Sequence, residues 1–266
     1  MRIIANYTVG FIRIQNGEHG KNLTLLGSGT LVTINGNHAI LTAHHVIEVL
    51  PASGELGLVY SERAMHGTIS TDGLRYIKIA RGTVASEGPD LGAVLLAPST
   101  VSWLGAYKSF HNLDLERTML LTNPPAIEDG LWIVQGFIAE RTKEELDFDR
   151  LIKMVRFFQL SSSGLVKPYS FAGYDYFNFP IKYSYSRRAL IPESYGGTSG
   201  GGLWQVRLER KKTTGELIPA TVPILSGLAF YQDGTESELS ALRCHGRRSI
   251  YGVAYEAIAA ASPSRP

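Results

Sequence analysis

Residues 27–46 read GSGTLVTINGNHAILTAHHV. Two β-rich runs flank Asn35-Gly36, a dipeptide typical of a tight hairpin turn. This stretch predicts a strand, a turn and a second strand that delivers His44-His45 at its end. A neutral imidazole exposed there can take a proton from a nucleophile and return it to a leaving group. Taken alone, the pair fits two ordinary surface histidines equally well.

Short β-rich runs bounded by Gly, Asn, Asp and Pro recur along the rest of the chain. They are Gly10–Ile14, Thr24–Ile34, His38–Thr42, Leu74–Ile79, Asp90–Leu96, Trp132–Ile138, Met154–Leu160, Gly202–Leu208, Val222–Tyr231 and Ser249–Tyr255. Helical periodicity is confined to Val46–Leu50 and Tyr255–Ala261. The sequence therefore predicts an all-β fold with short peripheral helices, built as two successive antiparallel units that are joined within Leu104–Glu128.

Composition narrows the class of protein. The chain has 266 residues, 44% of them hydrophobic and 19% charged, which is enough to bury a sizeable core. The net charge is only +2 and the basic residues are scattered, so we expect no nucleic-acid partner. The densest basic stretch, Arg207–Lys212, precedes Thr213-Thr214-Gly215 and fits an exposed hairpin turn. No apolar run reaches the ~18 residues of a spanning helix, so we expect no membrane segment.

Cysteine content and the first residues bear on the compartment. Cys244 is the single cysteine, so an intrachain disulfide and a cysteine-based metal cluster within one chain are excluded. We expect no metal site and no cofactor. The first twenty residues carry too brief an apolar stretch for a signal peptide. We therefore expect a cytoplasmic protein.

Two further motifs carry chemistry. In Gly88-Pro89-Asp90-Leu91-Gly92, a lone acid precedes an apolar strand, where its carboxylate could accept a hydrogen bond from a histidine and hold one tautomer. It could equally be an ordinary carboxylate at the start of a strand. The segment Gly196–Gly202 places five glycines around Thr198 and Ser199. Such a turn can expose a serine oxygen beside backbone N–H groups that bind an oxyanion, or it can be a flexible loop.

Other glycine-rich sites fit less well. A phosphate-binding P-loop is excluded because no Gly-Lys-Ser/Thr ending follows. An α/β-hydrolase is excluded by chain order, since its acid and histidine would follow the serine, whereas His45 and Asp90 precede Ser199 here.

These segments resemble chymotrypsin-like serine peptidases, including the broad bacterial group that contains the HtrA-type proteases. Leu41–Val46, Asp90–Leu95 and Gly197–Gly201 look like the histidine, aspartate and serine motifs of that family, in the same order, and the resemblance extends over Thr24–Tyr255. It implies two six-stranded β-barrels, an N-terminal one in residues 1–115 and a C-terminal one in residues 116–266. It also implies a triad of His45, Asp90 and Ser199 in the cleft between them, and an oxyanion hole formed by the N–H groups of Gly197 and Ser199.

The same resemblance implies a serine endopeptidase that acts on protein or peptide substrates. It places Glu193 at the base of the specificity pocket, where an acid would attract Arg or Lys. Phe230, Tyr231 and Gln232 would form the pocket wall and the strand against which substrate pairs.

One position departs from the family pattern. Thr198 stands where digestive members carry an aspartate that pairs with a newly cleaved N-terminus. We therefore expect a chain that is competent without trimming, or one that is switched by a regulatory partner or a conformational change. A catalytically silent binding module and an esterase remain the alternatives. The sequence leaves open whether Arg243, His245, Arg247 and Arg248 are exposed charge or contribute to recognition.

Overall fold

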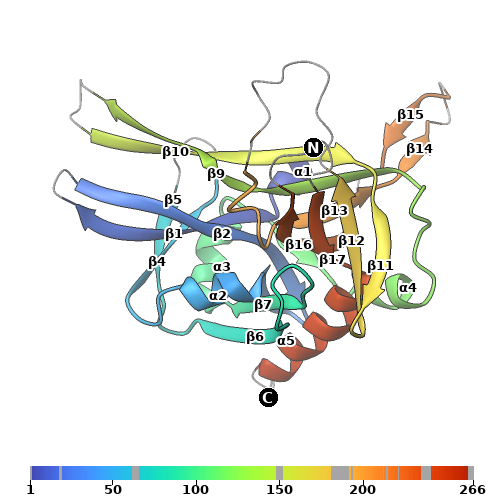
Figure 1. Ribbon diagram of the computed structural model, residues 1–266, viewed down its shortest axis with the longest axis horizontal. Coiled ribbons are helices and arrows are strands. Elements are labelled where there is room, and N and C mark those ends of the chain that lie inside the picture. The colour runs from blue at the N-terminus through green and yellow to red at the C-terminus, as the bar shows by residue number, and fades with distance from the viewer. Residues whose placement is uncertain are drawn as a thin grey trace.

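The protein is described by a computed structural model over residues 2–17, 20–61, 66–147, 152–180, 192, 194–211, 213, 215–220, 222–234 and 241–262. Two large antiparallel sheets dominate it (Figure 1). The strands of the first sheet come from residues 8–112 and those of the second from residues 131–245. The mostly β architecture predicted from the sequence is therefore confirmed.

The first sheet runs in the order β5-β4-β1-β2-β3-β7-β6, and β8 adds a short parallel pairing to β2. Its strands are β1 (Thr8–Gly17), β2 (Gly20–Ile34), β3 (Asn37–Thr42), β4 (Glu55–Val59), β5 (His66–Ser70), β6 (Arg75–Arg81), β7 (Asp90–Leu95) and β8 (His111–Asn112). The hairpin predicted from residues 27–46 is present as β2 and β3, and Asn35 and Gly36 both adopt positive φ in its turn.

The second sheet runs in the order β10-β9-β13-β16-β17-β12-β11. Its strands are β9 (Leu131–Asp147), β10 (Ile152–Gly164), β11 (Lys167–Phe171), β12 (Tyr174–Pro180), β13 (Gly202–Val206), β16 (Ile224–Asp233) and β17 (Ala241–His245). A separate two-stranded ribbon, β14 (Leu208–Arg210) with β15 (Leu217–Pro219), forms where the basic stretch predicts a hairpin.

Two details of the predicted barrels differ from the observed sheets. The sheets contain eight and seven strands instead of six, partly because the two-residue strand β8 adds to β2. Within the described residues, neither strand order closes on itself through hydrogen bonds. The closed double barrel and the domain boundary at residue 115 therefore stay predictions.

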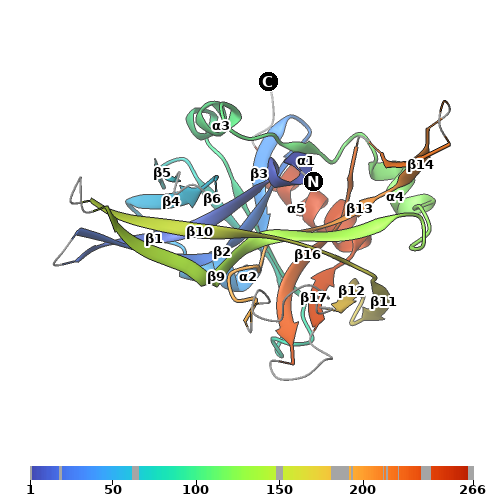
Figure 2. The same cartoon turned by 90° about the horizontal axis from the view of Figure 1, so that it is seen from above.

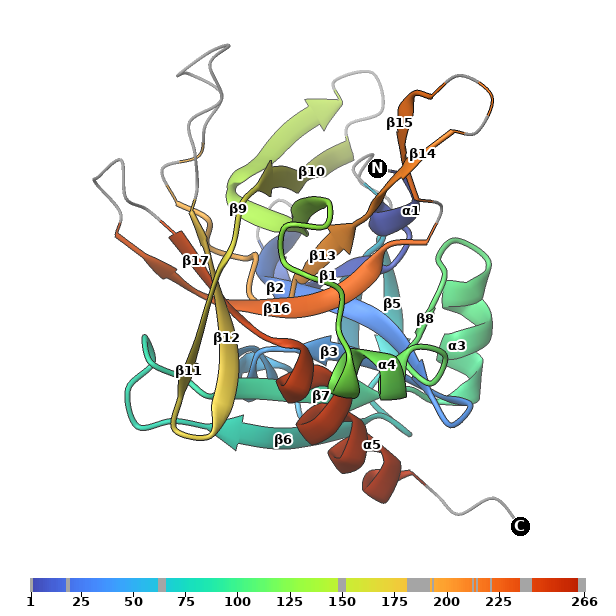
Figure 3. The same ribbon diagram turned by 90° about the vertical axis from the view of Figure 1, so that its right-hand side faces the viewer.

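Short helices lie around the sheets, as the sequence predicts. They are α1 (Arg2–Ala5), α2 (His44–Val49), α3 (Pro98–Gly105), α4 (Arg117–Thr122), the π-helix η2 (Ser249–Ala254) and α5 (Tyr255–Ala261). Helix α5 follows the second sheet in sequence but packs against β6 and β2 of the first (Figure 3). No helix in the described ranges is long and apolar enough to cross a membrane.

The strand predicted over Ser249–Tyr255 is wrong, because this segment is helical. The carboxylate of Asp175 accepts the backbone N–H groups of Arg248 at 2.9 Å and Ser249 at 2.8 Å. These contacts satisfy N–H groups that a helix start otherwise leaves without partners. Ile250 and Tyr251 are fully buried, so tertiary contacts outweigh the β-propensity of this segment.

The two sheets share a hydrophobic core. One cluster joins Leu41 and Leu91 of the first sheet to Trp204 and Leu225 of the second. The two sheets also meet through the long hairpins β1–β2 and β9–β10, which run beside one another and project together from the body (Figures 1 and 2). The sheets are thus packed into one body, and the loops at their junction are held from both sides.

Candidate active site

The register between β3 and β7 brings His45 and Asp90 together. The two strands are antiparallel, and Thr42 at the end of β3 lies opposite Gly92 near the start of β7. Asp90 is the first residue of β7, and His45 lies in the first turn of α2, just beyond β3. His45 and Asp90, 45 positions apart in sequence, are thereby neighbours where these two strands end.

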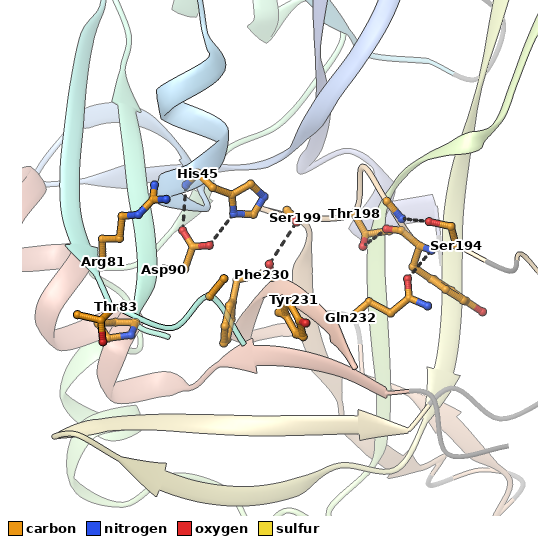
Figure 4. A pocket seen from close by; sticks show the side chains of 15 residues that line it. His45, Arg81, Thr83, Asp90, Ser194, Thr198, Ser199, Phe230, Tyr231 and Gln232 are labelled. Atoms are coloured by element: carbon orange, nitrogen blue, oxygen red, sulfur yellow. Dashed lines mark hydrogen bonds and ion pairs between the residues drawn. The ribbon is translucent and has the colours of Figure 1, made fainter. Parts of the chain in front are cut away.

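His45 and Asp90 are joined by two hydrogen bonds (Figure 4). The Asp90 carboxylate accepts the backbone N–H of His45 at 2.9 Å, and its second oxygen lies 2.5 Å from His45 Nδ1. Burial alone would raise the pKa of Asp90, but the hydrogen bonds and charge of His45 outweigh it, so the pKa lies below its ordinary value. Since an ionised carboxylate can only accept, His45 Nδ1 carries the proton and Nε2 is left as a base.

A buried histidine, His245, binds the backbone of Asp90. Its Nε2 accepts the backbone N–H of Asp90 at 3.0 Å, and the ring packs against Phe230 and Tyr176 with centroids 4.8 and 5.2 Å away. The side chain is fully buried, and burial lowers the pKa of His245 to about 4. The imidazole is therefore neutral near pH 7, and its hydrogen bond to the backbone N–H of Asp90 involves no charge on the histidine.

Of the four residues left open by the sequence, His245 and Arg247 are buried and are not surface charge. Arg247 donates to the Ser226 hydroxyl at 3.1 Å and the Pro125 carbonyl at 2.9 Å. Arg243 pairs with Asp233 at 2.7 Å and donates to the Ser86 carbonyl at 2.6 Å. Arg248 is exposed.

Ser199 lies on the other side of His45 (Figure 4). His45 has a side chain that is 42% exposed, and both residues line one pocket of about 430 Å³. The Ser199 hydroxyl donates to the Phe230 carbonyl at 3.3 Å. Among the hydrogen bonds of the described residues, none joins Ser199 Oγ to His45, so the third member of the predicted triad is present in the pocket but is not paired with the base.

The nucleophile loop, residues 196–200, has nearly all of its backbone polar groups paired. Ser28 binds two of its carbonyls, that of Gly197 through its hydroxyl at 2.6 Å and that of Ser199 through its N–H at 2.8 Å. The Gly196 carbonyl accepts the Ala139 N–H at 2.8 Å, and the Thr198 carbonyl accepts the Gly201 N–H at 2.7 Å. The Gly200 carbonyl accepts the Thr30 hydroxyl at 3.1 Å. Among the N–H groups, that of Gly196 donates to Ser194 Oγ at 3.1 Å. The Thr198 N–H donates to the Tyr195 carbonyl at 3.1 Å, and the Gly200 N–H donates to the Ala229 carbonyl at 2.7 Å.

The two remaining groups of this loop are the N–H groups of Gly197 and Ser199. Within the described part of the chain, neither has a hydrogen-bond partner. These are the two donors that the sequence predicts for an oxyanion hole. Unpaired N–H groups beside a serine hydroxyl can bind a developing negative charge on oxygen.

Three stretches of the chain line the pocket besides His45, Asp90, Thr198 and Ser199. They contribute Arg81, Gly82, Thr83, Ala85 and Pro89; Ser194, Tyr195 and Gly196; and Phe230, Tyr231 and Gln232. Phe230, Tyr231 and Gln232 thus line the pocket, as the sequence predicts. Gln232 Oε1 also accepts the Tyr195 N–H at 2.8 Å and so links the pocket wall to the nucleophile loop. Glu193 lies outside the described residues.

Neighbouring charges are mostly engaged elsewhere. His44 is buried and its side chain lies 3.6 Å from Glu48, and burial lowers the pKa of His44. Glu48 also pairs with Arg81 at the edge of the pocket. Within the described residues, no group of three or more His, Cys, Asp or Glu side chains could hold a metal ion. An imidazole can transfer a proton and a serine hydroxyl can attack a carbonyl carbon, so the pocket holds side chains of both kinds in His45 and Ser199.

Of the residues that support the site, Ser28 was missed from the sequence and the role of His245 was left open. Ser28 belongs to the first quoted stretch, where a polar residue between two glycines was a usable signal. His245 ends strand β17, which is not among the predicted β-rich runs, and no local pattern assigns the histidine to the site. Comparison of the sequence with protein-family models and with curated proteins finds no match.

Proposed function

We propose that this protein is a serine endopeptidase of the chymotrypsin-like kind, in which each of the two sheets forms one barrel of the double-barrel fold. The observation that carries the proposal is the joint placement of a hydrogen-bonded His45–Asp90 pair and Ser199 around one pocket, with the unpaired N–H groups of Ser199 and Gly197 in the loop that carries the serine.

The reaction follows from the roles of these groups. Ser199 Oγ attacks the carbonyl carbon of a peptide bond while His45 Nε2 takes the hydroxyl proton. The N–H groups of Gly197 and Ser199 bind the oxyanion, and ionised Asp90 stabilises the imidazolium. His45 then gives the proton to the leaving amine. Water, activated in turn by His45, hydrolyses the acyl-enzyme and regenerates the Ser199 hydroxyl.

The proposed substrate is an extended protein or peptide segment that lies along Phe230–Gln232 with one side chain in the pocket. The contact of the Ser199 hydroxyl with the Phe230 carbonyl is the one observation that favours a partner-activated form of the enzyme. In that form, partner or substrate binding would turn the hydroxyl toward His45. We propose a cytoplasmic setting on the basis of the sequence alone.

Covalent labelling with a fluorophosphonate tests the proposal, because this probe reacts only with an activated serine. We expect mass addition at Ser199 in the wild type, none at this position in Ser199→Ala, and a rate lowered by about a millionfold in His45→Ala. Ser102→Ala, which removes an exposed hydroxyl on α3, is the matched control and should label like the wild type.

Each result has a distinct meaning. Labelling at Ser199 that requires His45 would support the enzyme and justify a screen for cleavage sites. A wild type that melts cooperatively but does not label would overturn the constitutive enzyme and favour the partner-activated form or a binding module.

A further inference from the structure

Ser28 is a fully buried hydroxyl at the junction of the two sheets. It lies on β2 of the first sheet, and its Oγ is 2.8 Å from the Phe137 amide nitrogen on β9 of the second. The same Oγ is 2.6 Å from the Gly197 carbonyl oxygen in the nucleophile loop. Because an amide N–H can only donate and a carbonyl can only accept, the single hydroxyl proton points at Gly197.

The backbone of Ser28 reinforces this contact. Its N–H donates to the Ser199 carbonyl at 2.8 Å, and its carbonyl accepts the Thr42 hydroxyl at 2.8 Å. Thr42 ends the strand that leads to His45. One residue therefore contacts the nucleophile loop twice and is tied to the strand that carries the base.

The Ser28 hydroxyl holds the peptide plane that lies between the two oxyanion donors. The Gly197 N–H belongs to the plane before it and the Ser199 N–H to the plane after it. Gly197 has φ of +93°, a conformation in which glycine meets little steric resistance to rotation. A loop of this kind keeps its donors aimed only if hydrogen bonds restrain the planes. The central plane is held at its carbonyl by Ser28 at 2.6 Å and at its N–H by the Tyr195 carbonyl at 3.1 Å, so Ser28 supplies the shorter of its two restraints.

All of these restraints are uncharged. Thr198 is 2% exposed and its hydroxyl donates to the Tyr195 carbonyl at 2.7 Å, so no carboxylate occupies this place in the loop. A neutral anchor from β2 needs no newly formed N-terminal amine to complete it.

We propose that Ser28 is a positioning residue for the oxyanion hole: its hydroxyl orients the Gly197–Thr198 peptide so that the two unpaired N–H groups point at the reacting carbonyl oxygen without proteolytic trimming. This inference rests on the proposed function, because it concerns the same pocket. It adds a role for a residue on the first sheet in aiming donors on the second.

The test compares Ser28→Ala with Thr30→Val. Both remove one hydroxyl of β2 that donates to a carbonyl of the nucleophile loop, but the Thr30 hydroxyl holds Gly200, beyond the oxyanion donors. We expect the rate constant for fluorophosphonate labelling to fall about 10- to 100-fold in Ser28→Ala, on the scale of a damaged oxyanion hole, and less than threefold in Thr30→Val.

Two further readouts separate positioning from general stability. The His45 Nδ1 proton, observed at low field by proton NMR, should persist in Ser28→Ala because the His45–Asp90 pair does not depend on the hydroxyl, whereas the Gly197 amide resonance should shift. Ser28→Cys, which keeps a weak donor, should label at an intermediate rate. If Ser28→Ala does not melt cooperatively, Ser28→Cys carries the same comparison.

The failures are distinguishable. A wild type that does not label overturns the constitutive enzyme, and this inference with it, whether the chain is a partner-activated enzyme or a binding module. A folded Ser28 variant that labels within threefold of the wild type overturns the positioning role alone. Loss of labelling together with the His45 proton also overturns it, because the damage would then extend to the whole site.

Discussion

Acid should destabilise this protein through two buried histidines, and His245→Gln is the variant that tests the reasoning. His245 is fully buried and His111 is 6% exposed. Burial lowers the pKa of each imidazole to about 4, and for His245 this effect outweighs the opposing charges of Asp90 and Asp175. In the unfolded chain both would titrate near 6.5.

The sign follows from proton binding. Between pH 6.5 and about 4 the unfolded chain binds more protons at these two sites than the folded protein, so the free energy of unfolding falls as the pH falls. Below that window both states are protonated and no further loss arises from them. At about 1.4 kcal/mol per pH unit, each histidine accounts for about 3 kcal/mol across the window.

Urea denaturation of the wild type, His245→Gln, His111→Gln and the double variant, at intervals from pH 7.5 to 4.5, measures this loss. Glutamine does not titrate, and its side-chain oxygen can accept the Asp90 N–H that His245 Nε2 accepts now. Each single variant should lose about 2–3 kcal/mol less than the wild type on acidification, and the double variant about twice that. Comparison within each variant removes the cost of altered packing.

The pH range also keeps Asp90 out of the measurement. Its pKa in the folded protein lies below the ordinary value, so the stability it contributes is present above the unfolded pKa and is lost only as the pH falls below about 4. A His245→Gln variant that keeps the full pH dependence of the wild type, while His111→Gln loses part of it, would refute the view of His245 as a buried neutral support for Asp90.

Two further substitutions bear on the catalytic pocket. Asp90→Asn should lower kcat about 10⁴-fold with little change in KM, because an amide in this place favours the wrong His45 tautomer. Steady-state kinetics with a peptide that the enzyme cleaves measure this change. A loss of kcat below tenfold would contradict the role of Asp90. Gly200→Ala should abolish labelling and lower stability by about 1–3 kcal/mol, since its Cβ would lie 2.0 Å from the Ser28 carbonyl oxygen at a φ of +90°. Gly54→Ala is its control, with a φ of +89° and no atom within 4 Å, and should label normally; equal labelling rates in the two variants would show that the close approach at Gly200 is not needed.

Much of the candidate site was accessible from sequence because its residues occupy local patterns. A polar residue at the end or start of a β-rich run marked His45 and Asp90, and the glycine-dense turn marked Gly197 and Ser199. Pairing between distant segments was not accessible in this way. The strand predicted at Ser249–Tyr255 shows the limit, because the Asp175 carboxylate on β12 makes that segment helical.

Local sequence by itself determined most of the β-rich runs, the hairpin turn at Asn35-Gly36 and the C-terminal helix. These features depend on side-chain sterics and on periodicities of a few residues. Only the tertiary structure decided that His245 lies beneath Asp90 and that the Ser28 hydroxyl points at Gly197. Those contacts join residues more than 150 positions apart, and they form because buried polar groups must find partners wherever the packing of the two sheets leaves them.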